Sequence, residues 1–323
     1  MTNIMQADHC VGSGQKMKTI LITSVKGGVG KSTVTAGLGA ALAAMGKRVL
    51  ICDLDLGNPS LDLICGCEDN VLLDLGDVVC RGVPPESALI SLREERLWLL
   101  PAPRSAGYTE SGFGDTVNAD AANTDKAGGE AVHGETAPPD CLSCLIPALG
   151  RLLRDTGGAV SADYLLLDTP GHTGDIVKAA ARCADAAIVV STQQPAALRG
   201  AQTTALLLSM QGVEDVRLVV NRFDFPSAAD GRRSDLLSMI DGIGLRLAAV
   251  IPEDRVVGDA QHRGLLVDEQ PFMRIRGGRL KPLRDIAAAY INLALRADRS
   301  EQPLFEGFKR KRSRRRSLGI QGI

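Results

Sequence analysis

The feature that most constrains the fold of this chain is a glycine-rich loop between a short apolar run and a helical segment. The loop reads Lys-Gly-Gly-Val-Gly-Lys-Ser-Thr over residues 26–33. Residues 19–23 are rich in β-forming side chains, and residues 32–45 are rich in Ala and Leu at helical spacing. Such a loop directs backbone N–H groups at phosphate oxygens where the helix begins. We therefore predict a phosphate-binding loop in which Lys31 reaches the β- and γ-phosphates and the Ser32 hydroxyl ligates Mg²⁺.

Apolar runs recur along the chain with helix-length segments between them. After residues 19–23 they are Val49–Cys52, Leu97–Leu100, Tyr164–Leu167, Ala186–Ser191, Val216–Val220 and Leu245–Ile251. This alternation predicts an α/β fold, a doubly wound and mainly parallel sheet with helices on both faces, of the P-loop NTPase class. Aromatic residues make up only 3% of the chain, so we expect a core of Leu, Val, Ile and Ala. Ligands of such sheets bind at the carboxyl ends of the strands.

The composition divides the chain into one ATPase-sized domain, an insertion and two terminal segments. Residues 18–298 carry the strand and helix pattern, whereas residues 105–140 are rich in Gly, Ala, Thr, Asp and Glu and are predicted to be a disordered insertion. Residues 1–17 are predicted to be a disordered extension, and residues 299–323 a basic tail with seven cationic side chains between Lys309 and Arg316. Because the net charge of the whole chain is -1, the remainder is acidic. This asymmetry indicates that the tail contacts an anionic surface, either lipid or nucleic acid.

Neither a secretory leader nor a membrane span is expected from the sequence. The first seventeen residues lack the apolar stretch of a signal peptide, and no run of eighteen apolar residues occurs. The eight cysteines are scattered, as is typical of proteins in a reducing compartment. We predict a cytoplasmic protein that contacts a membrane only peripherally, at the inner face of the cell membrane.

A second lysine in the loop carries further information. Val25 stands where the strict P-loop pattern has glycine, and Lys26 comes immediately before the double glycine. With this loop the sequence resembles the MinD/ParA family of deviant Walker A ATPases, over about residues 18–295, and is closest to the MinD branch with its flagellar-number relatives. In that family the lysine equivalent to Lys26 crosses a dimer interface to the partner's bound phosphates. The resemblance implies an ATPase that forms a homodimer with ATP, in which Lys26 and Lys31 are catalytic and the nucleotide is wrapped by Gly27, Gly28, Val29, Gly30, Lys31, Ser32 and Thr33.

Asp168 is the candidate metal-binding carboxylate. It closes the apolar run 164–167 and precedes Thr-Pro-Gly, which is the layout of a Walker B aspartate that holds Mg²⁺ through water. His172 follows closely, and we interpret it as an exposed loop histidine. A base at that position is less consistent with phosphoryl transfer, which depends mainly on positioning and electrostatics.

The segment from Asp53 to Asp62 is similar to the family's D-x-D-x-G-x-x-x-L-D stretch, with Ser60 where the family often has Asn. By that match Asp53 lies near Mg²⁺ and Asp55 positions the attacking water.

Adenine contacts are expected from two further strand ends. Asn221 and Arg222 follow the run Val216–Val220, and Pro252 and Glu253 follow the run that ends at Ile251. The resemblance implies both assignments, and each pair falls at a strand end, where the fold class places ligands.

Two cysteine pairs, Cys65 with Cys67 and Cys141 with Cys144, raise the alternative of a metal cluster. Iron–sulfur carriers of the Mrp type share the glycine-rich loop and use a C-x-x-C pair that lies well after the Walker B strand. Here Cys141 and Cys144 precede Asp168 within an apolar segment of helical character. The position therefore favours ordinary packing for Cys141 and Cys144.

The resemblance implies an ATP-dependent, MinD-like spatial regulator for division-site placement. Its ATP dimer would adsorb to an anionic membrane through the basic tail and recruit partners until a protein activator triggers hydrolysis. At this stage two alternatives stay open. One is a ParA-like DNA-partitioning switch, whose basic tail would bind DNA, or a flagellar-number regulator. The other is an Mrp-type iron–sulfur carrier.

Overall fold

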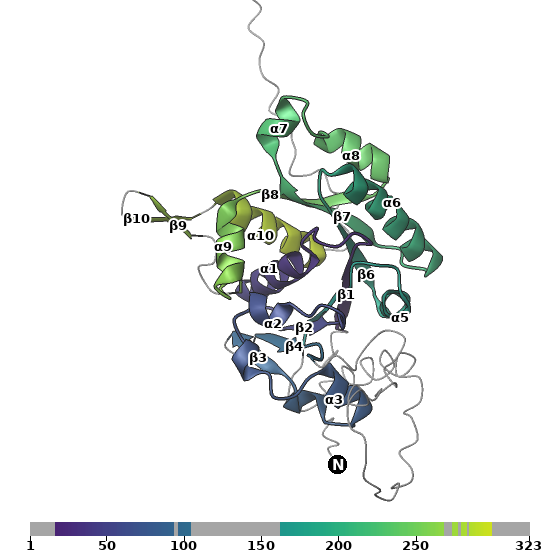
Figure 1. Cartoon of the computed structure of the whole chain (residues 1–323), viewed down its shortest axis with the longest axis vertical. Helices are drawn as coiled ribbons and strands as arrows, with labels where there is room; N and C mark the ends of the chain where they lie inside the picture. The colour runs from purple at the N-terminus through teal and green to yellow at the C-terminus, as the bar shows by residue number, and fades with distance from the viewer. Residues whose placement is uncertain are drawn as a thin grey trace, which may run out of the picture.

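An eight-stranded sheet forms the centre of the computed structural model, which describes residues 17–93, 96–104, 162–267, 273–276, 279–282 and 284–298. The strand order is β3-β4-β2-β5-β1-β6-β7-β8 (Figure 1). Neighbouring strands pair in parallel except β3, which runs antiparallel to β4 at one edge. The strands are β1 (Lys18–Thr23), β2 (Val49–Asp53), β3 (Ile90–Arg93), β4 (Leu97–Leu100), β5 (Tyr164–Asp168), β6 (Ala186–Ser191), β7 (Val216–Phe223) and β8 (Arg246–Pro252). The predicted α/β fold with a mainly parallel sheet is confirmed.

The sequence pattern missed three strands and shortened a fourth. It did not predict β3, nor the separate antiparallel ribbon of β9 (Met273–Arg276) and β10 (Arg279–Pro282). It also ended β7 too early, so Asn221 and Arg222 lie inside this strand rather than after it. The predicted terminal extension, except residue 17, the insertion, the basic tail and the pair Cys141 and Cys144 lie outside the described residues.

Helices cover both faces of the sheet, because successive side chains of its strands point to opposite sides. In β1, Ile20 and Ile22 join a core with α1 and α10, whereas Leu21 joins a second core with α5, α6 and α8. The helices are α1 (Lys31–Ala44), α2 (Leu61–Ile64), α3 (Leu75–Cys80), α5 (Asp175–Cys183), α6 (Pro195–Met210), α7 (Phe225–Ala229), α8 (Leu236–Ile243), α9 (Arg255–His262) and α10 (Arg284–Asp298). Within the described ranges, no helix combines the length and apolar character needed to cross a bilayer.

Close packing against α10 holds α1 in place. A Cβ atom at Gly37 of α1 would lie only 2.3 Å from Cε1 of Tyr290, so the tyrosine ring fills the space that a side chain would need. Tyr290 is buried, and its hydroxyl donates a hydrogen bond to the carbonyl oxygen of Thr33 at 3.4 Å. The last helix therefore supports the first turn of α1, which is the helix that follows the glycine-rich loop.

The C-terminal turn of α10 is fixed at the amino edge of the sheet, away from that loop. Lys18 Nζ donates to the carbonyl oxygen of Ala297 at 2.8 Å, and Arg217 Nη1 donates to that of Arg296 at 2.7 Å. The hydroxyl of Tyr164 donates to the carboxylate of Asp298. The bonds from Lys18 and Arg217 satisfy helix carbonyls near the end of the helix and place cations at its negative end.

Cys65 and Cys67 are buried core residues. Both lie in the core on the α1 face, and burial raises the pKa of the Cys67 thiol to about 11. A neutral buried thiol packs as a small apolar group. In the part of the chain that the structure describes, no group of three or more His, Cys, Asp or Glu side chains is placed to hold a metal ion.

Candidate nucleotide-binding site

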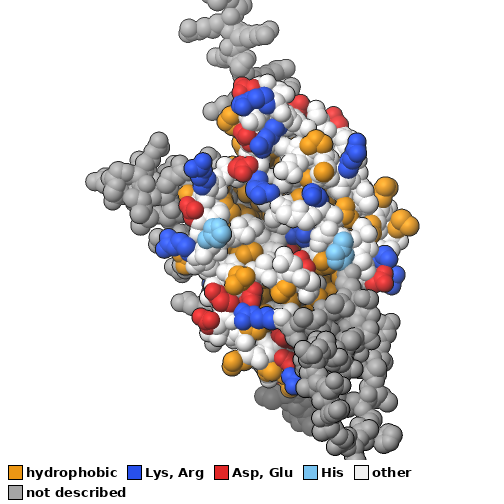
Figure 2. All heavy atoms as spheres, viewed as in Figure 1, with side chains coloured by type: hydrophobic (Ala, Val, Ile, Leu, Met, Phe, Trp, Pro, Cys, Tyr) orange, Lys and Arg blue, Asp and Glu red, His pale blue; other side chains and the backbone are white. Residues whose placement is uncertain are grey.

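The carboxyl ends of β1, β2, β5, β7 and β8 surround a hollow of about 900 Å³. It is lined by the glycine-rich loop, by residues 55–64 after β2, by residues 170–172 after β5 and by residues 251–262 at the end of β8 and in α9. On the face shown in Figure 2, Lys and Arg side chains lie among Asp and Glu side chains around α7, beside the carboxyl end of β7. The hollow thus lies where an open parallel sheet binds its ligand.

The glycine-rich loop takes a conformation that requires glycine at two positions. Gly28 and Gly30 have φ angles of 74° and 92°, in the left-handed region. A Cβ at Gly30 would lie 2.3 Å from Nδ2 of Asn221, so a side chain there would also displace the asparagine. No side-chain cap bonds the first turn of α1, which begins at Lys31, and its backbone N–H groups can therefore receive an anion.

The two lysines of the loop have opposite environments. Lys31 is only 7% exposed, and burial lowers its pKa while the nearby Asp168 and Asp55 charges oppose that lowering. Lys26, on the rim of the loop, is exposed. The structure therefore aims Lys31 into its own hollow and leaves Lys26 at the surface of the protein.

Asp168 ends β5 beneath the loop and carries a buried oxygen without a protein partner. Its Oδ1 accepts a hydrogen bond from Thr35 Oγ1 at 3.0 Å, whereas its Oδ2 has no hydrogen-bond partner within the described residues. Burial raises the pKa of Asp168 to about 6, against the opposing effects of the Ser32 hydroxyl and the Lys31 charge. An unsatisfied buried carboxylate oxygen beside a hydroxyl fits a hard cation such as Mg²⁺.

Asp53 lies beside Asp168 in the register of β2 and β5, and both of its carboxylate oxygens accept hydrogen bonds from backbone amides. Oδ1 accepts from the amide of Asp55 at 2.9 Å, and Oδ2 accepts from the amides of Ser60 and Leu61, both at 3.3 Å. Burial first and the Asp168 charge second raise the pKa of Asp53 well above its usual value. Asp53 therefore shapes the loop after β2, in addition to any contact that it makes with a metal.

Asp55 faces the same hollow from that loop. Its Oδ1 accepts a hydrogen bond from the amide of Asn58 at 3.1 Å, which turns the loop back on itself. Partial burial raises the pKa of Asp55, and the Lys31 charge is the largest effect that opposes the rise. The segment after Asp168 also approaches the loop closely, because a Cβ at Gly171 would lie 2.9 Å from Cα of Gly27.

Asn221 and Arg222 bind the glycine-rich loop directly. Asn221 Nδ2 donates to the carbonyl oxygen of Val29 at 2.9 Å, and Arg222 Nη2 donates to that of Gly28 at 2.7 Å. Arg222 has a φ of 50°, a left-handed conformation that is uncommon for a residue other than glycine. Both residues line the hollow, and no local sequence pattern indicates that they also hold the loop.

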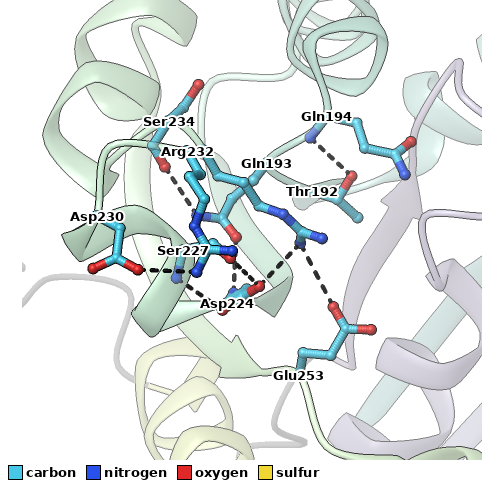
Figure 3. Close-up of polar contacts among 10 residues, drawn as sticks. Thr192, Gln193, Gln194, Asp224, Ser227, Asp230, Arg232, Ser234 and Glu253 are labelled. Carbon is cyan, nitrogen blue, oxygen red and sulfur yellow. Dashed lines mark hydrogen bonds and ion pairs between the residues drawn. The ribbon is translucent and has the colours of Figure 1, made fainter.

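A polar network joins the loops that follow β6, β7 and β8 at the rim of the hollow (Figure 3). Gln193 accepts from the amide of Asp224 at 2.8 Å and donates to the carbonyl oxygen of Ser234 at 2.9 Å. Arg233 Nη1 lies 3.8 Å from both Asp224 Oδ2 and Glu253 Oε2. The network orients the segment that contains Glu253.

Sequence reasoning missed several residues that line or support the hollow. Thr35 could have been found from its position four residues after Lys31 on one helix. His172, Gln261 and His262 also line the hollow, and no local pattern marks them as ligand contacts. His172 is exposed, as predicted.

A glycine-rich loop between a parallel strand and a helix, with a buried carboxylate on the adjacent strand, defines a P-loop nucleotide-binding protein. A family model described as the CobQ/CobB/MinD/ParA nucleotide binding domain matches residues 20–267. The chain belongs to this family.

Curated relatives cover most of the chain. The septum site-determining protein MinD of Bacillus subtilis is 29% identical over 290 residues, which is 89% of this chain and 91% of that protein. A putative MinD of Guillardia theta is 33% identical over 251 residues, 76% of this chain and 79% of that protein.

A solved structure of the MinC:MinD cell division complex of Aquifex aeolicus is similar, with a TM-score of 0.66 and 26% identity over 89% of this chain and 98% of that one. The predicted membership of the MinD/ParA family is confirmed. The chain is a nucleotide-binding ATPase of this family. A similar solved structure, MinD of Pyrococcus horikoshii, is a complex with Mg-ADP, with a TM-score of 0.62 and 24% identity over 88% of this chain and 97% of that one.

Proposed function

We propose that this chain is a MinD-like ATPase that places the division site by switching between a monomer and an ATP-bound homodimer. Its relatives are named septum site-determining proteins, and they match this chain over most of its length. The observation that supports the switch is the contrast between Lys31, which is buried and lines the hollow, and Lys26, which is exposed at the start of the same loop. One loop thus offers one cation to its own nucleotide and one to a second protomer.

The residues of the hollow divide the work of hydrolysis. The loop amides and Lys31 bind the phosphates, while Asn221 and Arg222 keep the loop in its binding conformation. Ser32 and Asp168 would hold Mg²⁺, which neutralises phosphate charge when bound. Asp55, which also lines the hollow, orients the attacking water, and Lys26 of a second protomer supplies further positive charge.

The proposed roles extend to the residues that contact the adenine and to the partners of the dimer. Pro252 and Glu253, with Asn221, form the wall that receives the adenine. A protein activator accelerates hydrolysis, and the basic tail at 299–323 attaches the dimer to an anionic membrane at the inner face of the cell. Two tails in one dimer bind such a surface more tightly than one, and ATP thereby controls attachment.

Self-association and turnover test the switch. We expect Lys26→Ala to abolish ATP-dependent dimerisation, measured by light scattering after size exclusion, and to lower kcat, while ADP still binds the monomer. Lys31→Ala should abolish nucleotide binding itself. If Lys26→Ala leaves dimerisation and kcat unchanged, the protein is a single-subunit phosphate binder and the switch is wrong.

Liposome flotation tests whether the ATP-bound protein attaches to an anionic membrane. We expect the full chain to float with anionic vesicles in ATP and to sediment in ADP. Retention on DNA without flotation would instead support a DNA-partitioning role.

A further inference from the structure

We infer that Thr204 and Gly200, on α6, are positioning residues for Lys26. This inference rests on the proposed role of Lys26 in the ATP-bound dimer. The two residues lie one turn apart on the buried side of α6, more than 170 positions from the loop in sequence, and both contact its first residues.

A hydrogen bond ties the loop to Thr204. The amide of Val25 donates to Thr204 Oγ1 at 3.1 Å, and that hydroxyl donates to the carbonyl oxygen of Gly200 at 2.7 Å. Thr204 is 1% exposed, so water does not compete for its hydroxyl. Because the hydroxyl proton is engaged with α6, the oxygen is oriented to accept from Val25.

The glycine on the previous turn lets α6 approach the loop. A Cβ at Gly200 would lie 3.1 Å from Cγ2 of Val25, 3.4 Å from Cβ of Lys26 and 3.7 Å from the Lys26 amide nitrogen. The first of these distances is shorter than an ordinary van der Waals contact, so a methyl group at position 200 requires Val25 to shift by a few tenths of an ångström, while it would touch Lys26 at ordinary contact distance. The Lys26 stem thus leaves the protein from a base packed on α6.

These contacts matter because the loop departs from the strict P-loop pattern at Val25. The amide of Lys26 donates to Ser24 Oγ at 3.2 Å, so both peptide groups before the double glycine are held by hydroxyls. A long lysine side chain that must reach a phosphate on another protomer loses conformational freedom on binding. Fixing its backbone in advance lowers that cost and directs the ammonium group toward the partner.

The test compares Thr204→Val with Thr203→Val. Thr203 is a matched control, because its hydroxyl also donates to a carbonyl one turn back, that of Arg199 at 3.1 Å, but its side chain is exposed. For Thr204→Val we expect ATP-dependent dimerisation to weaken about 3- to 10-fold and kcat to fall, as for loss of one buried hydrogen bond. ADP affinity of the monomer should stay within about twofold, because Lys31 serves that step. Thr203→Val should match the wild type, and Thr204→Ser should restore dimerisation.

Gly200→Ala tests the packing contact independently and should weaken the dimer in the same way. If Lys26→Ala abolishes the dimer but Thr204→Val and Gly200→Ala do not weaken it, this inference fails and the proposed switch stands. If both variants reduce ADP affinity as much as dimerisation, α6 supports the whole loop and the specific role for Lys26 is overturned. If Lys26→Ala itself has no effect, the proposed function fails first.

Discussion

Replacing Asp168 with asparagine is expected to stabilise the metal-free protein while abolishing hydrolysis. Asp168 is fully buried, and its pKa is raised from 3.8 to about 6 by burial. A shift of that size corresponds to a cost of about 3 kcal/mol for the ionised form above pH 6, as an upper limit. The amide of the asparagine has N–H groups that lack acceptors, which lowers the stability by about 1 kcal/mol. The net gain in the free energy of unfolding is therefore about 2 kcal/mol at pH 7.5.

The sign of the pH dependence follows from the direction of the shift. An aspartate whose pKa is raised by folding takes up its proton in the folded state first, so its cost disappears as the pH falls from about 6 toward 3.8. At pH 5 the cost should be about half of its value at pH 7.5. The gain from Asp168→Asn should therefore fall from about 2 to about 0.5 kcal/mol, because the cost of about 1 kcal/mol from the amide without acceptors does not change with pH.

Urea unfolding in EDTA at pH 7.5 and pH 5.0 measures this difference. Asp175→Asn is the matched control, because Asp175 is exposed and the ion pair with Lys178 lowers its pKa. That variant should gain no stability at either pH. The reasoning is refuted if Asp168→Asn is no more stable than the wild type at pH 7.5 without metal, or if its gain does not fall at pH 5.0.

Three further substitutions test the packing and the rim. Gly37→Ala should lower the free energy of unfolding by about 1–3 kcal/mol in urea, since its methyl group meets the Tyr290 ring, and an unchanged midpoint would contradict that packing. Asn221→Ala leaves the Val29 carbonyl without its donor and should weaken ADP binding about 5- to 30-fold by calorimetry, whereas wild-type affinity would show that the loop holds itself. Arg233→Met removes long, half-exposed ion pairs and should change stability by less than about 0.5 kcal/mol.

Local sequence patterns were sufficient to predict the fold because the central strands are short apolar runs. All residues of β6 and all but the first residue of β1 are buried, and such apolar runs predict a sheet that is covered on both faces. The edge strand β3 is different, because Ile-Ser-Leu-Arg is half exposed and carries a charge, which is how edge strands avoid further pairing. Because β3 is not an apolar run, the pattern that predicts the central strands does not predict it.

The candidate site was predictable where its chemistry is local and unpredictable where it depends on distant contacts. The phosphate loop and Asp168 each carry their own signature, so they could be placed from neighbouring residues alone. The bond from Asn221 to Val29 joins residues 192 positions apart, and no window of sequence contains both. The role of Asn221 in holding the loop therefore required the three-dimensional arrangement.

The anchoring of the last helix separates two jobs in space. Asp298 is held by Tyr164 and by Lys47, whose Nζ lies 3.0 Å from its carboxylate, at the amino edge of the strands. The nucleotide hollow opens at the carboxyl edge of the same strands. The chain therefore leaves α10 at the edge of the sheet opposite to the one where the nucleotide hollow opens. In the proposed switch, the start of the segment after Asp298 and the dimer contact around the nucleotide then lie on different surfaces, so they do not compete with each other.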